Sequence, residues 1–99
     1  MNKYNEMSDF EINKKVFIKL YGEESLKDKD MFGVFNRSDY CNNPSDAMPI
    51  INKYGISLIY QDGKFQFATH DGNIECCDNN PLRASMIVLL CMLDGGYEP

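Results

Sequence analysis

The sequence has little of what catalytic sites and nucleic-acid-binding surfaces are built from. It contains one histidine, and its 10 lysines and arginines are outnumbered by 15 aspartates and glutamates, which gives a net charge of −5. Both halves of the chain are acidic, so no basic face is available to neutralise phosphates. An acidic surface also repels anionic lipid headgroups. We therefore expect neither direct nucleic-acid binding nor membrane binding.

Long hydrophobic runs and export signals are missing as well. No apolar run follows the lysine near the N-terminus, as it would in a secretory signal peptide. The most apolar stretch, residues 81–93, would form a helix of about 20 Å, too short to cross a bilayer. The four cysteines are then expected to be free thiols in a reducing compartment. We expect a cytoplasmic protein.

Catalytic and metal-binding motifs are also absent. The sequence has no Gly-x-Ser-x-Gly, Gly-x-x-x-x-Gly-Lys or His-Glu-x-x-His. Cys76 and Cys77 are adjacent, without the Cys-x-x-Cys spacing of zinc sites. His70 with Cys41 and Cys77 is one alternative, as a metal site or a nucleophilic pair, but a surface histidine is the simpler interpretation. The sequence predicts no cofactor, no metal and no catalytic residue.

The strongest structural feature is the stretch 81–93, in which Arg83 and Ser85 are the only clearly polar side chains. Asn80 precedes it as an N-cap, and Pro81 suits the first helical position, where no N–H is needed. A helix that is apolar nearly all round must be covered on most sides. We therefore predict a buried C-terminal helix onto which the rest of the chain packs.

Another helix is predicted near the N-terminus. Ser8 and Glu11 have the spacing of a capping box, and Gly22 marks the end of the helix. Its lysines form a solvated face or, in the alternative interpretation, a docking face. Residues 23–30 are predicted to be an exposed loop, and residues 31–36 a short strand.

A third helix is predicted to end at Tyr54. Asn43 followed by Pro44 is typical of a helix start, but Pro49 would then lie inside the helix, where proline removes a hydrogen bond. We favour Ser45 as the cap, because this places Pro49 in the first turn. The alternative is a helix that begins at Pro44 and is kinked at Pro49.

The clearest β pattern surrounds Asp62-Gly63, a preferred two-residue hairpin turn. The flanking segments predict a hairpin over residues 56–69, with Ala68 on the face away from the core. A second turn at residues 71–72 predicts a further strand at residues 74–76. The hairpin pairs expected to face the core are Tyr60 with Phe65, Leu58 with Phe67, and Ile56 with Thr69.

These patterns predict a single α+β domain over residues 1–99. Three helices pack on a small antiparallel sheet of two to four strands, with the central hairpin at 56–69 and the C-terminal helix 81–93 buried. The apolar content of 43% is enough for one core without disulfides or metal. Residues 1–6 and 96–99 are expected to be loose tails.

A polar spot is predicted where two of the helices begin. Arg83 is the only charge in the core helix and needs a partner or access to water, because burying an unpaired charge is costly. Asn43 and Asn80 are the two Asn-Pro caps, and Asp46 lies in a first turn. One interpretation is a binding or catalytic spot, with Asp39 and Asp46 as paired carboxylates. The favoured one is capping plus an ion pair that fixes how the helices meet.

Three segments around these residues carry a resemblance. They read Ser-Asp-Phe-Glu-Ile-Asn at 8–13, Asn-Asn-Pro-Ser-Asp-Ala-Met-Pro-Ile-Ile at 42–51, and Asn-Pro-Leu-Arg-Ala-Ser-Met-Ile-Val at 80–88. They resemble, in the same order, the signature blocks of the phage NinX family, small proteins encoded by lambdoid phages and prophages of enteric bacteria. Met48 stands where the family is expected to have tryptophan, so a role that needs an aromatic side chain there is unsupported.

The resemblance implies a phage accessory protein made in the cytoplasm of the bacterial host, with a layout similar to small phage α-β-α sandwich domains. It supplies no catalytic residues. We expect the protein to act by binding a host or phage protein, for regulation or counter-defence. DNA mimicry is a less favoured form of this protein-binding hypothesis, because lysines are interleaved with the acidic residues. The alternatives are a small enzyme or ligand-binding protein that uses the polar spot, and a structural homo-oligomer.

Overall fold

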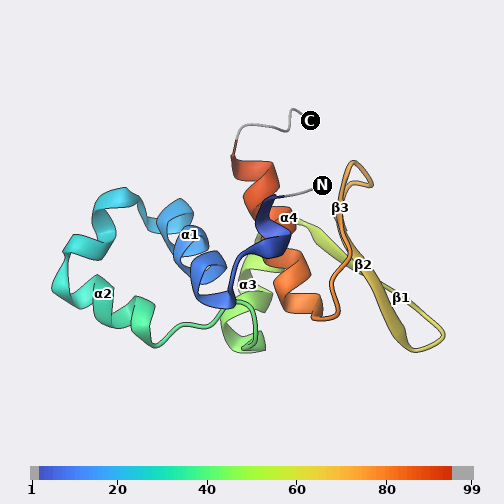
Figure 1. Cartoon of the computed structure of the whole chain (residues 1–99), viewed down its shortest axis with the longest axis horizontal. Coiled ribbons are helices and arrows are strands. Elements are labelled where there is room, and N and C mark those ends of the chain that lie inside the picture. The colour runs from blue at the N-terminus through green and yellow to red at the C-terminus, as the bar shows by residue number, and fades with distance from the viewer. Residues whose placement is uncertain (1–2, 95–99) are drawn as a thin grey trace.

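The computed structural model describes residues 3–94, which form helices and one antiparallel sheet (Figure 1). The predicted α+β class is confirmed. One α-helix more than predicted is present. In chain order the elements are the 3-10 helix η1 (Lys3–Glu6), α1 (Asp9–Tyr21), the 3-10 helix η2 (Glu23–Lys27), α2 (Lys29–Asn36), α3 (Pro44–Tyr54), β1 (Ile56–Gln61), β2 (Lys64–His70), β3 (Ile74–Cys76) and α4 (Pro81–Leu93).

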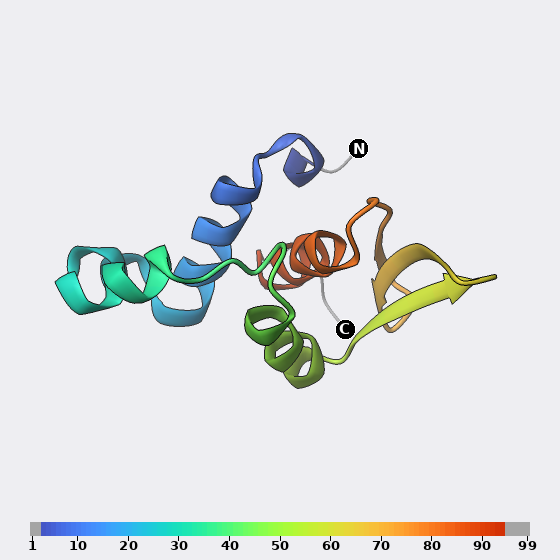
Figure 2. The same cartoon turned by 90° about the horizontal axis from the view of Figure 1, so that it is seen from below.

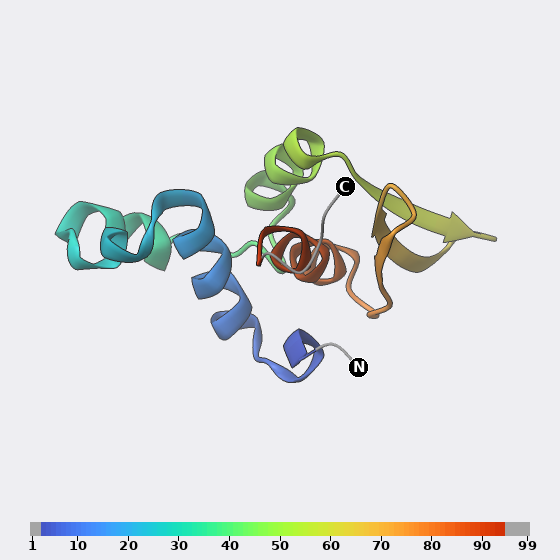
Figure 3. The same ribbon diagram turned by 90° about the horizontal axis from the view of Figure 1, so that it is seen from above.

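Helix α4 lies at the centre of the molecule. It contacts α1 and α3 on one side and all three strands on the other (Figure 2, Figure 3). Every side chain from Ala84 to Leu90 is buried, as the apolar sequence predicts. Ser85 can be buried among them because its hydroxyl donates to the carbonyl of Pro81 at 2.8 Å. The buried apolar side chains of the described residues form one cluster around this helix.

Helix α1 begins and ends as its sequence predicts. The hydroxyl of Ser8 accepts from the amide of Glu11, and the Glu11 carboxylate accepts from the amide of Ser8, which completes the capping box. Gly22 ends the helix with φ of +97°, a conformation that favours glycine. Ile12 and Phe17 are fully buried on its inner face.

The prediction of a strand at residues 31–36 is wrong, because this segment lies in α2. The side chain of Asp28 accepts hydrogen bonds from the amides of Asp30 and Met31 and so caps a helix. A short apolar run is ambiguous between strand and helix by periodicity alone. The preceding residues, predicted to be an exposed loop, include η2, which has no buried residue.

Helix α3 begins at Pro44, so the preference for Ser45 as its cap is wrong. The side chain of Asn43 accepts from the amide of Ser45 at 3.0 Å, and Pro49 lies inside the helix. The helix ends at Tyr54 as predicted, and Gly55 caps it with φ of +69° in the left-handed region.

The hairpin turn is confirmed, but the predicted register holds only next to it. Asp62 and Gly63 have φ of +54° and +77°, as a type I′ turn requires, and Tyr60 pairs with Phe65. Beyond that pair the register shifts, because Gln66 is an extra residue in β2.

The pairings of Leu58 with Phe67 and of Ile56 with Thr69 are therefore wrong. Leu58 pairs with Ala68, and Ile56 pairs with His70.

The bulge changes which residues of β2 face the core. Ala68, predicted on the outer face, is fully buried instead. It pairs with Cys76 of β3, which is also buried, so the predicted third strand is confirmed. A one-residue slip moves every later side chain to the other face of a strand, so the single bulge accounts for both errors.

The N-terminal segment differs from the loose tail predicted at residues 1–6. Residues 3–6 form η1, and the ring of Tyr4 is buried in the core. The tail predicted at 96–99 lies outside the described residues.

Replacing Pro49 by alanine should stabilise the protein. Pro49 is exposed, so no cavity results, and the new amide can donate to the carbonyl one turn earlier. We expect the free energy of unfolding in urea to rise by about 2 kcal/mol. Part of the stabilisation from the new hydrogen bond is offset, because alanine gives the unfolded chain more conformational freedom than proline does. The matched control is Pro44→Ala, at the first helical position, which should not stabilise. Equal effects of the two changes would contradict this account.

Candidate functional site

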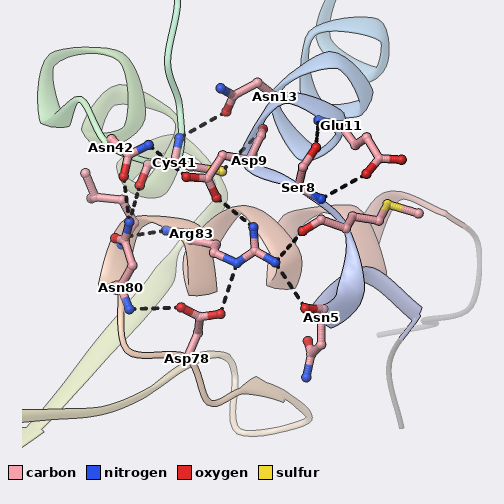
Figure 4. A network of polar contacts seen from close by, with 12 residues as sticks. Asn5, Ser8, Asp9, Glu11, Asn13, Cys41, Asn42, Asp78, Asn80 and Arg83 are labelled. Carbon is pink, nitrogen blue, oxygen red and sulfur yellow. Dashed lines mark hydrogen bonds and ion pairs between the residues drawn. The ribbon is translucent and has the colours of Figure 1, made fainter.

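The polar residues highlighted by the sequence gather where α1, α3 and α4 begin (Figure 4). The guanidinium of Arg83 lies at the centre of this region, and its side chain is only 12% exposed. It forms ion pairs with Asp9 (Nη1–Oδ1, 2.7 Å) and Asp78 (Nε–Oδ2, 3.0 Å). Its Nη2 donates to the carbonyls of Asn5 and Met7 at 3.1 and 2.6 Å. The expected partner of Arg83 therefore exists, but Asp46 is not among the groups it contacts.

Asn80 joins the start of α4 to the segment that precedes α3. Its side-chain oxygen accepts from the amides of Leu82 and Arg83, as an N-cap does. Its side-chain nitrogen donates to the carbonyl of Cys41 at 2.7 Å and to Oδ1 of Asn42 at 2.9 Å. One side chain thus caps the core helix and fixes a loop about forty residues away in sequence.

A second group of amides and carboxylates links this loop to α1. Asn42 donates to Asp9 Oδ2 at 3.0 Å and to Asp39 at 3.2 Å. Asn13, buried in α1, donates to Asp39 Oδ1 at 3.0 Å and accepts from the amide of Cys41 at 3.1 Å. We call these residues, together with Arg83 and its partners, the polar network. Its side chains are Asp9, Asn13, Asp39, Asn42, Asp78, Asn80 and Arg83.

Asp39 and Asp46 do not act as paired carboxylates in this geometry. The carboxylate of Asp46 accepts from the backbone amide of Asp39 at 2.9 Å, which fixes the loop to the first turn of α3. Asn43 caps the same helix. The geometry favours capping and ion pairing as the role of the predicted spot, because its polar groups are used in contacts within the chain.

Four members of the polar network were missed by reasoning on charge and capping alone. Asp9, Asn13 and Asn42 fall inside the segments 8–13 and 42–51, so the resemblance of these segments to the NinX blocks was the one sequence feature that could have identified them. Asp78 lies in the loop before α4 and has no local signal, because its role depends on where Arg83 comes to lie.

The thiols near the network are unsuited to act as nucleophiles at neutral pH. Burial raises the pKa of Cys41 to about 12 and that of Cys76 to about 11, so both stay protonated. His70 lies at the end of β2, where its Nε2 is 3.5 Å from a carboxylate oxygen of Asp71. Across residues 3–94, no three histidine, cysteine or acidic side chains are grouped so as to hold a metal ion.

A groove of about 430 Å³ lies at the other end of α1, against the C-terminal end of α4. Lys15, Lys19 and Asp94 are at its edge, and Leu90 is among its apolar lining. None of the predicted site residues lines it. The polar network is thus separate from this groove.

Comparison with protein families gives a match over nearly the whole chain. The family model described as Bacteriophage P22, NinX covers residues 3–93. The chain belongs to this phage NinX family. Membership confirms the resemblance and supports a phage accessory protein. Neither the search of curated proteins nor the search of solved structures gave a match.

The structure gives the NinX-like segments a common location. Segment 8–13 supplies Asp9 and Asn13, segment 42–51 supplies Asn42, and segment 80–88 supplies Arg83. All three therefore meet in the polar network. For this NinX-family chain, no helix within residues 3–94 has the length and apolar character needed to span a bilayer.

Removing the central charge should destabilise the fold. Arg83→Met keeps a long side chain but leaves the carboxylates of Asp9 and Asp78 without their cation. We expect the free energy of unfolding to fall by about 2 kcal/mol, because the shielded guanidinium loses its charge-assisted hydrogen bonds while the carboxylate of Asp9 keeps partial access to water. The control is Lys19→Met, which removes the partly exposed ion pair with Asp94 and should cost less than about 1 kcal/mol. Similar losses in both variants would contradict a special role for Arg83.

Acid should weaken the fold through Asp9. The hydrogen bond from Asn42, and then those with Arg83, hold the pKa of Asp9 below its ordinary value. A carboxyl whose pKa is lowered by folding stabilises the protein above its unfolded pKa of about 3.9, and the effect is lost as pH falls through the folded value. We expect urea stability to fall from about pH 5 downward, and less steeply in Asp9→Asn. Asp30→Asn, which changes an exposed carboxylate, should keep the wild-type profile.

Proposed function

We propose that this phage accessory protein acts by binding another protein through an aromatic surface on α1 and α2. The observation that carries the proposal is the exposure of Phe10, Tyr21 and Phe32, whose side chains are 62%, 54% and 47% exposed. These three rings are named the aromatic surface. Among the described residues, only Tyr60 and Val34 are further large apolar side chains with comparable exposure, and Val34 also lies on α2.

The rings of the aromatic surface are held on one support. Phe35 of α2 is buried and packs edge-on against Phe10 at a centroid distance of 5.6 Å, and lies 6.4 Å from Phe32. It also contacts Phe17 at 5.4 Å, which in turn contacts Tyr21 at 4.7 Å. The exposed rings therefore belong to one continuous aromatic cluster that joins the two helices. Such clusters supply the central contacts of many protein interfaces.

The position of α2 makes this surface accessible. The helix lies at one end of the elongated molecule, beyond α1 and away from the sheet (Figure 1). Exposed apolar side chains gathered on one face are typical of binding sites in soluble proteins. The polar network fixes the start of α1 through Asp9, the residue before Phe10, and so supports a rigid position for Phe10.

Charge favours an acidic partner segment. Lys14 lies one turn after Phe10 and on the same stripe of α1 as Tyr21. It is exposed and forms no ion pair among residues 3–94. A carboxylate on the partner would meet it at the edge of the aromatic contact, which would speed association and set its orientation. The proposed partner is thus a host or phage protein with an apolar segment flanked by acidic residues.

The test is affinity purification from an enteric host with and without phage infection. We expect a stoichiometric protein to co-purify with the wild type, and Phe10→Ser with Phe32→Ser to weaken purified-partner binding by at least about tenfold. Both rings are exposed, so the fold should be retained, as circular dichroism would check. Tyr60→Ser removes an equally exposed ring at the opposite end and should leave binding intact. Binding that survives the double change, or that is lost equally in Tyr60→Ser, would refute this placement.

A further inference from the structure

The groove between α1 and the C-terminal end of α4 is separate from both surfaces described so far. No residue of the polar network or of the aromatic surface lines it. Its volume of about 430 Å³ lies within the range of about 300–1,000 Å³ that is typical of ligand pockets. Ile18 in its lining is half-buried, and Leu90 is fully buried. Gly22 adds no side chain, and a Cβ there would meet no atom within 4 Å beyond its neighbours in the chain. The groove therefore has free space beside an apolar surface.

The charges of the groove are only partly neutralised. Nζ of Lys19 forms an ion pair with Oδ1 of Asp94 at 2.8 Å. Lys15, one turn earlier on α1, also lines the groove, is exposed and forms no ion pair among residues 3–94. Glu23, the first residue of η2, lies beyond the end of α1. A carboxylate bound in the groove is therefore favoured near Lys15 and disfavoured near Glu23.

The two helices that form the groove run in the same direction. Their first turns are joined by the ion pair of Arg83 with Asp9, and their C-terminal ends by that of Lys19 with Asp94. A chain that leaves α4 at Asp94 and turns back along the groove thus runs from its acidic end toward Lys15.

We propose that the groove binds Tyr97 and Glu98 of the same chain, which follow Asp94 after two glycines. Asp94 lines the groove, so this segment starts at its edge. Three residues reach at most about 10 Å, and Leu90 is about 6 Å back along α4 from Asp94. Glycine adopts positive φ readily, so two glycines permit the reversal of direction that this path needs. The length of the segment therefore fits the distance to be covered.

Each group of the segment has a complement in the groove. The ring of Tyr97 packs against Ile18 and Leu90, and its hydroxyl stays in water at the mouth of the groove. The carboxylate of Glu98 then lies beside Lys15, at the end of the groove away from the acidic side chains. An aromatic residue followed by an acidic one matches an apolar surface followed by a lysine.

The chain's own segment is favoured over a separate peptide because it starts at the groove. A short link gives an effective concentration in the millimolar range, which a free peptide of the same chemistry would have to exceed. Binding within one chain also avoids most of the loss of translational and rotational freedom that association costs. One ring and one exposed ion pair are too weak to hold a free peptide but are sufficient for a tethered one. Docking then replaces the loose tail predicted at residues 96–99.

The experiment is methyl NMR of the full chain, at low and at high protein concentration. We expect through-space contacts between the ring of Tyr97 and the methyl groups of Ile18 and Leu90, whose signals should move upfield in the ring current. Tyr97→Ser should abolish both effects, and Pro99→Ser, in the same segment, should keep them. A contact within one chain should not depend on concentration. Absent contacts, or contacts that form only at high concentration, would overturn the proposal.

The direction of the segment has its own test. Glu98→Lys brings like charges together and should lower the ratio of docked to undocked chains about threefold, measured by the methyl shift of Ile18. Adding Lys15→Glu should restore most of the shift. Adding Lys14→Glu instead, at a lysine that does not line the groove, should not restore it. Circular dichroism checks that the variants are folded. Glu98→Lys without effect, or equal recovery in both double variants, would overturn the placement of Glu98 beside Lys15.

Discussion

The arrangement of this fold depends on satisfying one charge. Helix α4 is apolar enough to be the core, yet it carries Arg83 near its start, where the side chain is largely shielded from water. A shielded guanidinium needs acceptors on its donors, and an unpaired one would cost several kcal/mol. The acceptors come from the segment before α1, from Asp9, and from Asp78. These elements must therefore meet at the N-terminal end of α4.

An apolar contact at the same place would hold the helices together but would specify their orientation less strictly. Hydrogen bonds require particular distances and angles, so the start of α1 has few positions in which Asp9 can reach both Arg83 and Asn42. The aromatic side of α1 is fixed by the same contacts. Helix α2 is attached differently, through η2 and the ring of Phe35. The network thus orients α1, and α1 in turn carries the aromatic cluster.

What the sequence predicts well is local. The helix caps made by Ser8 and Asn80 and the turn at Asp62-Gly63 involve residues within a few positions, and each lies where its pattern indicates. The errors involve competition or distance. A six-residue apolar segment fits a strand or a helix, and the cap at Asp28 decides between them. The bulge at Gln66 could not be predicted, because neither of its neighbours in the sequence is a residue typical of turns or bulges. The partners of Arg83 are up to 78 residues away in sequence, beyond any local pattern.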